Sequence, residues 1–176
     1  MYTIISHNTQ KTYTITTPGE HVFYFENISA DIQCIIDTPN AHVRIYGLYT
    51  AANDDRYTLR LHQVHRAPHS HSSAQIKSIV SDRARLHITS MISVTKDAHE
   101  TDAHFTNNNL LLSPDASVTT VPQLEVIPHR VTCTHAATTA PLDRAQIHYM
   151  TTRGLPQKDA EKLLIEGFTH DITKNK

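Results

Sequence analysis

A thiol and an imidazole lie two positions apart at Cys133 and His135, inside a segment of alternating polar and apolar residues between Asn107 and Leu142. Alternate residues of a β-strand point to the same face, so both side chains are expected on one face together with Val131. Thiolates and imidazoles are ligands for soft metal ions. This pair is therefore our first candidate for a metal-binding site.

A structural role is the competing interpretation for these residues. Free cysteine usually behaves as a small buried apolar residue, and this role is favoured for Cys133 if its strand face points into a core. Cys34 alternates with Ile32 and Ile36 and is expected in the core for the same reason. For His135 a ligand or interface role and a purely structural role are both left open.

A second candidate site lies in the histidine-rich run from His62 to His71. If one strand includes both His69 and His71, their imidazoles share a face, as in the metal sites of cupin β-barrels. A cupin would also need a nearby glutamate and framing glycines, which the following residues do not supply. A mononuclear metal site at His69 and His71 is therefore a weaker hypothesis than a solvated histidine turn.

The composition narrows the classes of partner. The chain has 176 residues, with 16 lysines and arginines against 17 aspartates and glutamates, and no segment concentrates positive charge. Nucleic acids and anionic membrane surfaces are therefore poor partners. No apolar run approaches the length of a membrane span, and the first residues do not form a secretory leader. Two cysteines are too few for a disulfide framework, so a cytoplasmic protein with free thiols is expected.

Short alternating runs typical of β-strands recur from Tyr2 to Tyr149, separated by turn-forming asparagine, aspartate and proline. A small residue follows a turn and precedes an alternating run at Ala41, Ala84 and Ala116. Repeated units of this kind favour a solenoid of short strands slightly over a sandwich or a jelly roll. The chain has four glycines, so asparagine and aspartate are expected at the left-handed turn positions.

The pattern changes after Thr151. Pro156 suits the first turn of a helix, and an apolar stripe at helical spacing follows. The stripe comprises Ala160, Leu163, Leu164, Gly167 and Phe168. The sequence thus predicts a β domain over residues 1–150 and a C-terminal helical tail over residues 151–176, with one amphipathic helix of about four turns. The stripe would cover either the β domain or a groove on a partner.

Several short motifs occur in the order found in one known family. They are His65–Ser72, Asp82–Arg85, Asp97–Ala98 with Thr101–Ala103, Asn107–Ser113, Pro122–Val126, Val131–Thr138 and Tyr149–Gly154. This series resembles the core domain of the SufB/SufD family, the scaffold proteins of SUF iron–sulfur cluster assembly, over Tyr57 to Phe168. The triple asparagine Asn107–Asn109 and the segment Cys133–Thr138 match the SufD pattern more closely than the SufB pattern.

The resemblance implies an all-β fold, a right-handed parallel β-helix with a short C-terminal α-helical segment. It also implies that an ABC-type ATPase, SufC, docks on that segment and that two family members pair through their β-helices. The nascent cluster would form near that junction, and His135 falls on the histidine of SufD that is implicated there. ATP hydrolysis would belong to SufC, so the scaffold itself would not be an enzyme.

Some family features are absent from this chain. Family members are commonly much longer and carry an N-terminal helical region, and the glycine that usually follows the histidine is Ala136 here. In SufB the position of Asn107 carries a cysteine proposed to receive sulfur. Thiolate is the preferred ligand of iron–sulfur clusters and imidazole serves at some sites, so Cys133 and His135 supply only two of four ligands. A second subunit would supply the others.

The leading hypothesis is a non-catalytic scaffold subunit that pairs with a SufB-like partner or with a copy of itself and binds a SufC-like ATPase. It would present His135, together with Cys133, to a transient iron–sulfur cluster. The first alternative is a cupin-like β-barrel metal protein that uses His69 and His71. The second is an interaction module that has lost the cluster chemistry.

Overall fold

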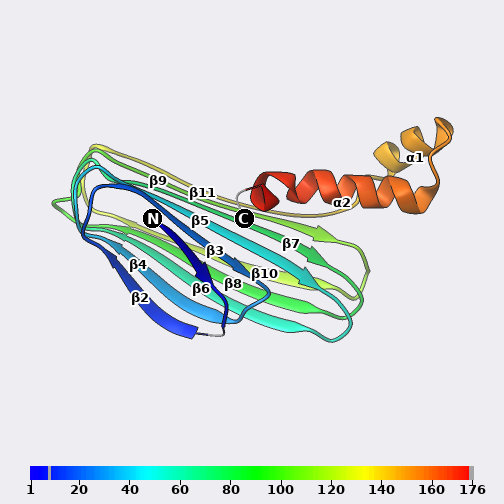
Figure 1. Cartoon of the computed structure of the whole chain (residues 1–176), viewed down its shortest axis with the longest axis horizontal. Coiled ribbons are helices and arrows are strands. Elements are labelled where there is room, and N and C mark those ends of the chain that lie inside the picture. Colours follow the sequence, from blue (N-terminus) through cyan, green and yellow to red (C-terminus); the bar gives the residue numbers. More distant parts are fainter. Residues whose placement is uncertain (8, 175–176) are drawn as a thin grey trace.

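Parallel strands wind back and forth between two facing sheets and form a flattened β-solenoid (Figure 1). The structure is a computed structural model, and it describes residues 1–7 and 9–174. Sheet A contains, in spatial order, β1 (Tyr2–Ile5), β3 (Gly19–Glu26), β5 (Ala41–Ala51), β7 (His71–Val80), β9 (Thr101–Leu111) and β11 (Val131–Pro141). Sheet B contains β10 (Ser117–Val126), β8 (Arg85–Val94), β6 (Arg56–His65), β4 (Ala30–Ile36) and β2 (Thr9–Ile15).

Each strand pairs in parallel with the strand two places away in the sequence, and consecutive strands alternate between the sheets. Leu86 of β8 is thus in register with Val118 of β10, and Val131 of β11 with Thr101 of β9. The parallel β-helix expected from the sequence is confirmed. The cupin-like β-barrel is wrong, because such a barrel would need antiparallel neighbours closed on one another.

The core lies between the sheets and consists of the inward-facing residue of each alternating pair. Its first part is built from large apolar side chains such as Phe23, Phe25 and Ile45, each 5% exposed or less. Gly47 lies directly beneath Phe25, and a Cβ at Gly47 would come within 2.5 Å of that ring. Glycine is therefore needed there because the aromatic ring fills the space that any side chain would occupy.

The turns follow the composition of the chain. Asparagine and aspartate take left-handed backbone conformations at Asn27, Asn40, Asn53 and Asp82, as the scarcity of glycine predicted. His69 and Glu100 also adopt positive φ, at 54° and 56°, which the sequence did not suggest. The alanines at positions 41, 84 and 116 are buried where the chain enters a strand. Small side chains there allow successive turns to stack closely.

The C-terminal region contains a helix that was not predicted from the sequence. Strand structure was expected as far as Tyr149, but β11 ends at Pro141 and α1 (Arg144–Thr152) follows. The carboxylate of Asp143 accepts hydrogen bonds from the first backbone N–H groups of α1, at Ala145 and Gln146. Gly154, with a φ of 93°, follows the end of this helix. The second helix, α2 (Gln157–Thr173), is the amphipathic helix that was predicted.

Only the C-terminal end of helix α2 lies on the outer face of sheet A (Figure 1). Ile172 is fully buried in a cluster with Tyr24 and Leu48. The ammonium group of Lys77 donates hydrogen bonds to Asp171 Oδ1 and to the Phe168 carbonyl, both at 2.6 Å. The apolar stripe therefore covers the β domain only in part. Among the described residues, no helix combines the length and the apolar character needed to cross a membrane.

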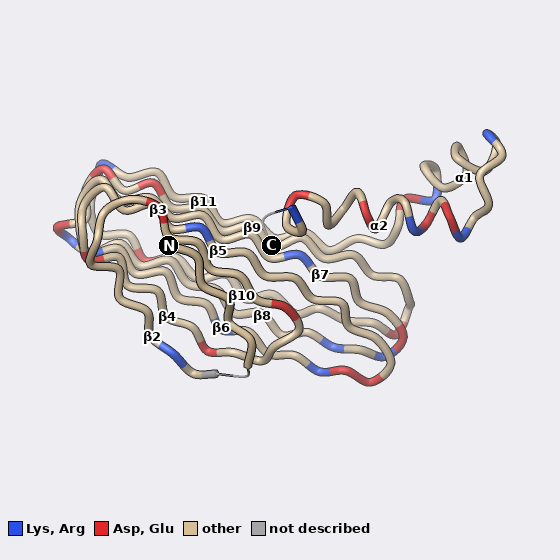
Figure 2. Tube along the Cα trace, in the orientation of Figure 1, with Lys and Arg blue, Asp and Glu red and all other residues tan. Residues whose placement is uncertain are grey.

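Helix α1 and the first half of α2 form a helical arm, residues 144–165, that projects beyond the solenoid (Figure 1). Leu163, expected in the covered stripe, is 54% exposed on this arm. Figure 2 shows that charged residues gather at the turns and along the arm, with both signs mixed. On the outer sheet faces, charges of opposite sign form pairs such as Arg44 with Glu20 and Arg60 with Asp31.

Candidate functional site

Strand β11 is the outermost strand of sheet A, and β10 is the outermost strand of sheet B at the same end of the solenoid. Within the described residues, β11 pairs with β9 alone and β10 pairs with β8 alone. We call this end, formed by β10 and β11, the open end. On β11, half-buried Val131, Cys133 and His135 alternate with exposed Thr132 and Thr134. The three side chains thus share the inner face of the last strand, as the alternation predicted.

The imidazole of His135 reaches across the interior to sheet B. Its Nε2 lies 2.7 Å from the hydroxyl oxygen of Ser90, a fully buried residue of β8. Its ring packs on Phe105, with the ring centroids 4.7 Å apart. Its Nδ1 is buried and has no hydrogen bond of normal geometry with any described residue. Burial lowers the pKa of His135, and an interaction with the backbone of Gln123 opposes this shift.

Cys133 is half-buried and packs against the edge of the core. Burial raises the pKa of its thiol, and the nearby Asp102 charge raises it further. The thiol is therefore protonated at neutral pH, and ligation of a metal would have to displace the proton. Cys34 lies in the core, as expected, and burial raises the pKa of its thiol to about 12. It makes no contribution to the open end.

Polar side chains continue along the interior beside His135. The fully buried Asn107 donates a hydrogen bond from Nδ2 to Thr120 Oγ1 at 2.9 Å. Two residues later, Asn109 Nδ2 lies 3.1 Å from the Thr138 carbonyl. The Oδ1 atoms of both asparagines are buried without a hydrogen-bond partner in the described part of the chain. Together with Ser90 and His135, these residues make the interior polar in the last rungs of the solenoid, where a rung is one strand of sheet B and the following strand of sheet A.

The second candidate site does not form. His69 lies in a turn and its ring faces His99, whereas His71 begins β7 and stacks on His42 with ring centroids 4.5 Å apart. His71 Nδ1 also lies 3.7 Å from Asp102 on the outer face of sheet A. No group of three potential ligand side chains among the described residues could hold a metal ion. The cupin-like pairing of His69 with His71, which was the weaker hypothesis, does not form because His69 adopts a left-handed turn conformation before β7 begins at His71.

His65 is fully buried and has a structural role. The hydroxyl of Ser70 donates to the Ala67 carbonyl at 2.9 Å, so it accepts a hydrogen bond from His65 Nδ1 at 2.7 Å. Nε2 then accepts from the hydroxyl of Ser72, also at 2.7 Å. Burial, the main cause, lowers the pKa of His65 to about 4, so the ring is neutral at pH 7. Both nitrogens are satisfied, and no ligand position remains.

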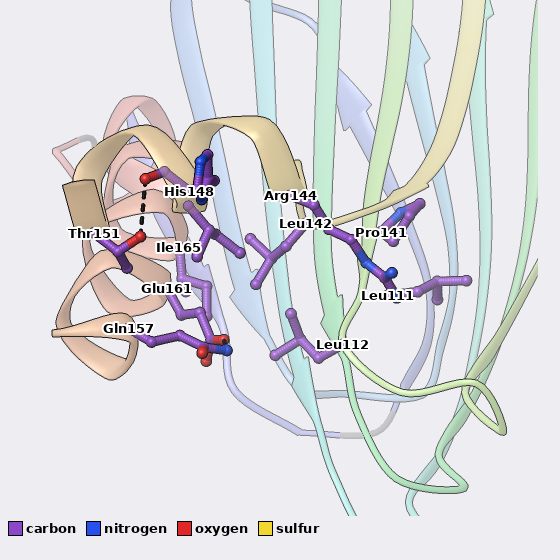
Figure 3. A pocket seen from close by; sticks show the side chains of 11 residues that line it. Leu111, Leu112, Pro141, Leu142, Arg144, His148, Thr151, Gln157, Glu161 and Ile165 are labelled. Carbon is purple, nitrogen blue, oxygen red and sulfur yellow. Dashed lines mark hydrogen bonds between the residues drawn. The ribbon is translucent and has the colours of Figure 1, made fainter.

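A cleft of about 570 Å³ lies between the helical arm and the ends of β9 and β11. Figure 3 shows that Leu112, Leu142 and Ile165 extend into it from the solenoid and from the arm. Arg144 and Glu161 add charged groups of opposite sign to its lining. More of the cleft surface is polar than apolar, because His148, Thr151 and Gln157 also line it.

A model of the family described as SUF system FeS cluster assembly, SufBD core domain, matches residues 22–168. The chain belongs to the SufBD core family. The family resemblance inferred from the sequence motifs is thereby confirmed. The matched range includes all residues of the open end and of the helical arm.

Relatives of this SufBD core chain include iron–sulfur cluster assembly proteins. SufD of Escherichia coli is 36% identical over 135 residues, which are 77% of this chain and 32% of that protein. A SufBD family protein of Synechocystis is 34% identical over 105 residues, 60% of this chain and 23% of that protein. One of Mycobacterium leprae is 28% identical over 167 residues, 90% of this chain and 41% of that protein. The chain therefore spans less than half the length of these relatives.

In this SufBD core, the site residues on β11 were predicted from the sequence, but the residues that hold them were not. Ser90 and Phe105, which contact His135, were not singled out, and neither was Thr120 beside Asn107. The triple asparagine was noticed only as part of a family motif. Its inward-facing members were a usable signal, since asparagine on the buried face of a strand is unusual.

Proposed function

We propose that this SufBD core chain is a non-catalytic scaffold subunit in iron–sulfur cluster assembly. In this role its solenoid pairs through the open end with a SufB-like partner or with a second copy of itself. A cluster then forms at the junction of the two solenoids, as transient cargo that is passed on. Membership of the SufBD core family supports the assembly role.

The observation that carries this proposal is the position of β11. An edge strand can pair with another chain through its free backbone groups, and this one also bears Cys133 and His135. Beside it, Leu124 and Ile127 are 52% and 57% exposed. A second solenoid at this end would cover these apolar side chains. It would also bring the additional ligands that a cluster needs, because a two-fold arrangement repeats each residue.

The helical arm supports a second partner, an ABC-type ATPase resembling SufC. Tyr149 is 61% and Leu163 is 54% exposed on the arm, and the cleft described above lies at its base. Large apolar side chains exposed on a projecting helix pair are typical of a docking surface. In this proposal ATP hydrolysis belongs to the partner, and the scaffold carries out no covalent turnover.

Anaerobic reconstitution with iron and sulfide tests the cluster role. The chain is incubated alone and with a SufB-like partner, and cluster absorbance is measured on each separated assembly. We expect absorbance only in the paired assembly, and we expect His135→Ala to remove most of it because the imidazole would be a ligand. His87→Ala, which alters an exposed histidine on β8, is the matched control and should retain the cluster.

A paired assembly that keeps its full cluster content with His135→Ala would contradict the proposed role of His135. A paired assembly that never acquires a cluster would instead favour an interaction module without cluster chemistry. Cys133→Ser in the same experiment separates the two candidate ligands. A loss with this variant equal to that of His135→Ala would assign ligation to both residues, and no loss would leave Cys133 as a packing residue.

A further inference from the structure

The imidazole of His135 is directed into the solenoid and away from the junction proposed above. Nε2 lies 2.7 Å from Ser90 Oγ, and Ser90 is 0% exposed. Nδ1 is also buried. A group located outside the open end can therefore reach neither ring nitrogen in this conformation. Any ligand role of His135 has to account for this arrangement.

The contact with Ser90 blocks Nε2 whichever atom carries the proton. If the serine hydroxyl donates, it occupies the lone pair of Nε2 that a metal would need. If the hydroxyl accepts, Nε2 carries a proton and has no lone pair to offer. A metal or cluster can therefore use Nε2 only after the hydrogen bond to Ser90 has been broken. This conclusion needs no assignment of the tautomer.

The position of Ser90 in the fold allows its hydroxyl to hold the His135 ring. It lies on the inner face of β8, in register with Pro122 of the edge strand β10. The bond to His135 is the only hydrogen bond of the Ser90 side chain among the described residues, so no other partner competes for the hydroxyl. Phe105, the neighbour of His135 in register on β9, supports the ring from one side. The two contacts come from opposite sheets and together fix the ring.

We propose that Ser90 is the positioning residue of His135. Its hydroxyl holds the imidazole in an inward, closed conformation, and binding of cargo at the open end requires this hydrogen bond to break. The role of an open conformation, in which His135 binds cargo, rests on the proposed function. The closed conformation, in which Ser90 holds the ring, does not. Before a second solenoid pairs at the open end, His135 would therefore be in the closed conformation and unable to bind a metal.

Chemical modification of the single chain tests the closed conformation without iron, sulfide or a partner. Diethyl pyrocarbonate acylates an unprotonated, accessible imidazole nitrogen, and peptide mass spectrometry gives the rate for each histidine at pH 8. We expect His135 to react more slowly than the exposed His129 in the wild type. We expect Ser90→Ala to accelerate His135 about fivefold, because one hydrogen bond no longer holds the ring.

The control variant changes another serine of the same strand that binds another histidine. Ser93 Oγ lies 2.8 Å from His62 Nε2 on the outer face of sheet B. Ser93→Ala should accelerate His62 and leave the rate of His135 unchanged. His65, fully buried with both nitrogens bonded, should remain slow in both variants, which reports that the solenoid is folded.

Two results would overturn the inference. One is a wild-type His135 that reacts as fast as His129, and the other is a Ser90→Ala chain in which His65 stays slow and His135 keeps its wild-type rate. The proposed function is judged separately by reconstitution. If Ser90→Ala accelerates His135 but His135→Ala keeps its cluster, the positioning role stands and the cluster role fails. If reconstitution depends on His135 while Ser90→Ala leaves its reactivity unchanged, only the positioning role fails.

Discussion

The interior of the solenoid differs between its first rungs and its last. Between β3 and β5 the inward-facing side chains are almost all apolar, with Phe23, Phe25 and Ile45 each 5% exposed or less. Between β8 and β11 the same inner positions include Ser90, Asn107, Asn109 and His135. Both regions have the same parallel pairing and the same turn chemistry, so the backbone does not explain the change.

The difference indicates that the first part of the solenoid provides stability, whereas the open end provides polar side chains. Burial of apolar side chains stabilises the first rungs, at roughly 25 cal/mol for each Å² removed from water. Buried polar atoms without partners cost free energy, about 1–3 kcal/mol each. The unpaired Oδ1 atoms of Asn107 and Asn109 therefore weaken the rungs next to the open end. We infer that the first rungs carry the stability that the polar end lacks.

The strongest test of this division compares two aliphatic residues. Ile45 is 1% exposed in the apolar region, whereas Leu124 is 52% exposed at the open end. We expect Ile45→Ala to lower the free energy of unfolding by about 3–4 kcal/mol, because it leaves a cavity between the sheets. Leu124→Ala should change it by less than about 1 kcal/mol. Urea unfolding followed by circular dichroism measures both, and equal losses would remove the distinction.

The second test concerns pH and the buried His65. Its pKa is lowered from 6.5 to about 4, chiefly by burial and also by His71, with Asp102 opposing the shift. Between these values the unfolded chain binds more protons than the folded one, so the free energy of unfolding falls as the pH falls. The full contribution is present above pH 6.5, and the loss reaches about 3 kcal/mol once the pH is below the folded pKa.

Urea unfolding at several values between pH 7 and pH 4 measures this loss. A His65→Gln chain should show a flatter pH dependence, because glutamine can donate and accept hydrogen bonds without titrating. The matched control is His87→Gln, at an exposed position of β8, which should keep the acid loss of the wild type. An unchanged acid loss in His65→Gln would show that the neutral, buried state of His65 is not its source.

The sequence predicted the architecture well and the contacts of the site poorly. Strand alternation and the recurrent alanines are local signals and favoured a solenoid only slightly, whereas the parallel β-helix was implied by the resemblance of the ordered motifs to the SufB/SufD family. The bond between Ser90 and His135 joins residues 45 positions apart in opposite sheets. It depends on how β8 and β11 are aligned across the core, and alternation within one strand contains no information on that alignment.

Helix α1 was missed for a different physical reason. Ile147, Tyr149 and Thr151 alternate as in a strand, while Ile147 and Met150 also have the spacing of one helix face. Alternation continued the strand pattern before it, so the segment was assigned to the β region. The deciding signal was Asp143, whose side chain caps the first backbone N–H groups of the helix. Capping residues are therefore more informative here than hydrophobic periodicity.

The smallest expected effect tests the polar end directly. Asn107 is fully buried, and its Oδ1 has no partner among the described residues. Leucine has a similar size, so Asn107→Leu should raise the free energy of unfolding by about 1 kcal/mol, since it removes an unpaired polar atom. The half-buried Thr120 loses its bond from Nδ2 but can turn toward water at the open end.

Asn108→Leu, on the outer face of the same strand, is the matched control and should give no such gain. A destabilised Asn107→Leu chain in urea unfolding would mean that the polar interior contributes to stability, and the two regions would then differ in chemistry alone.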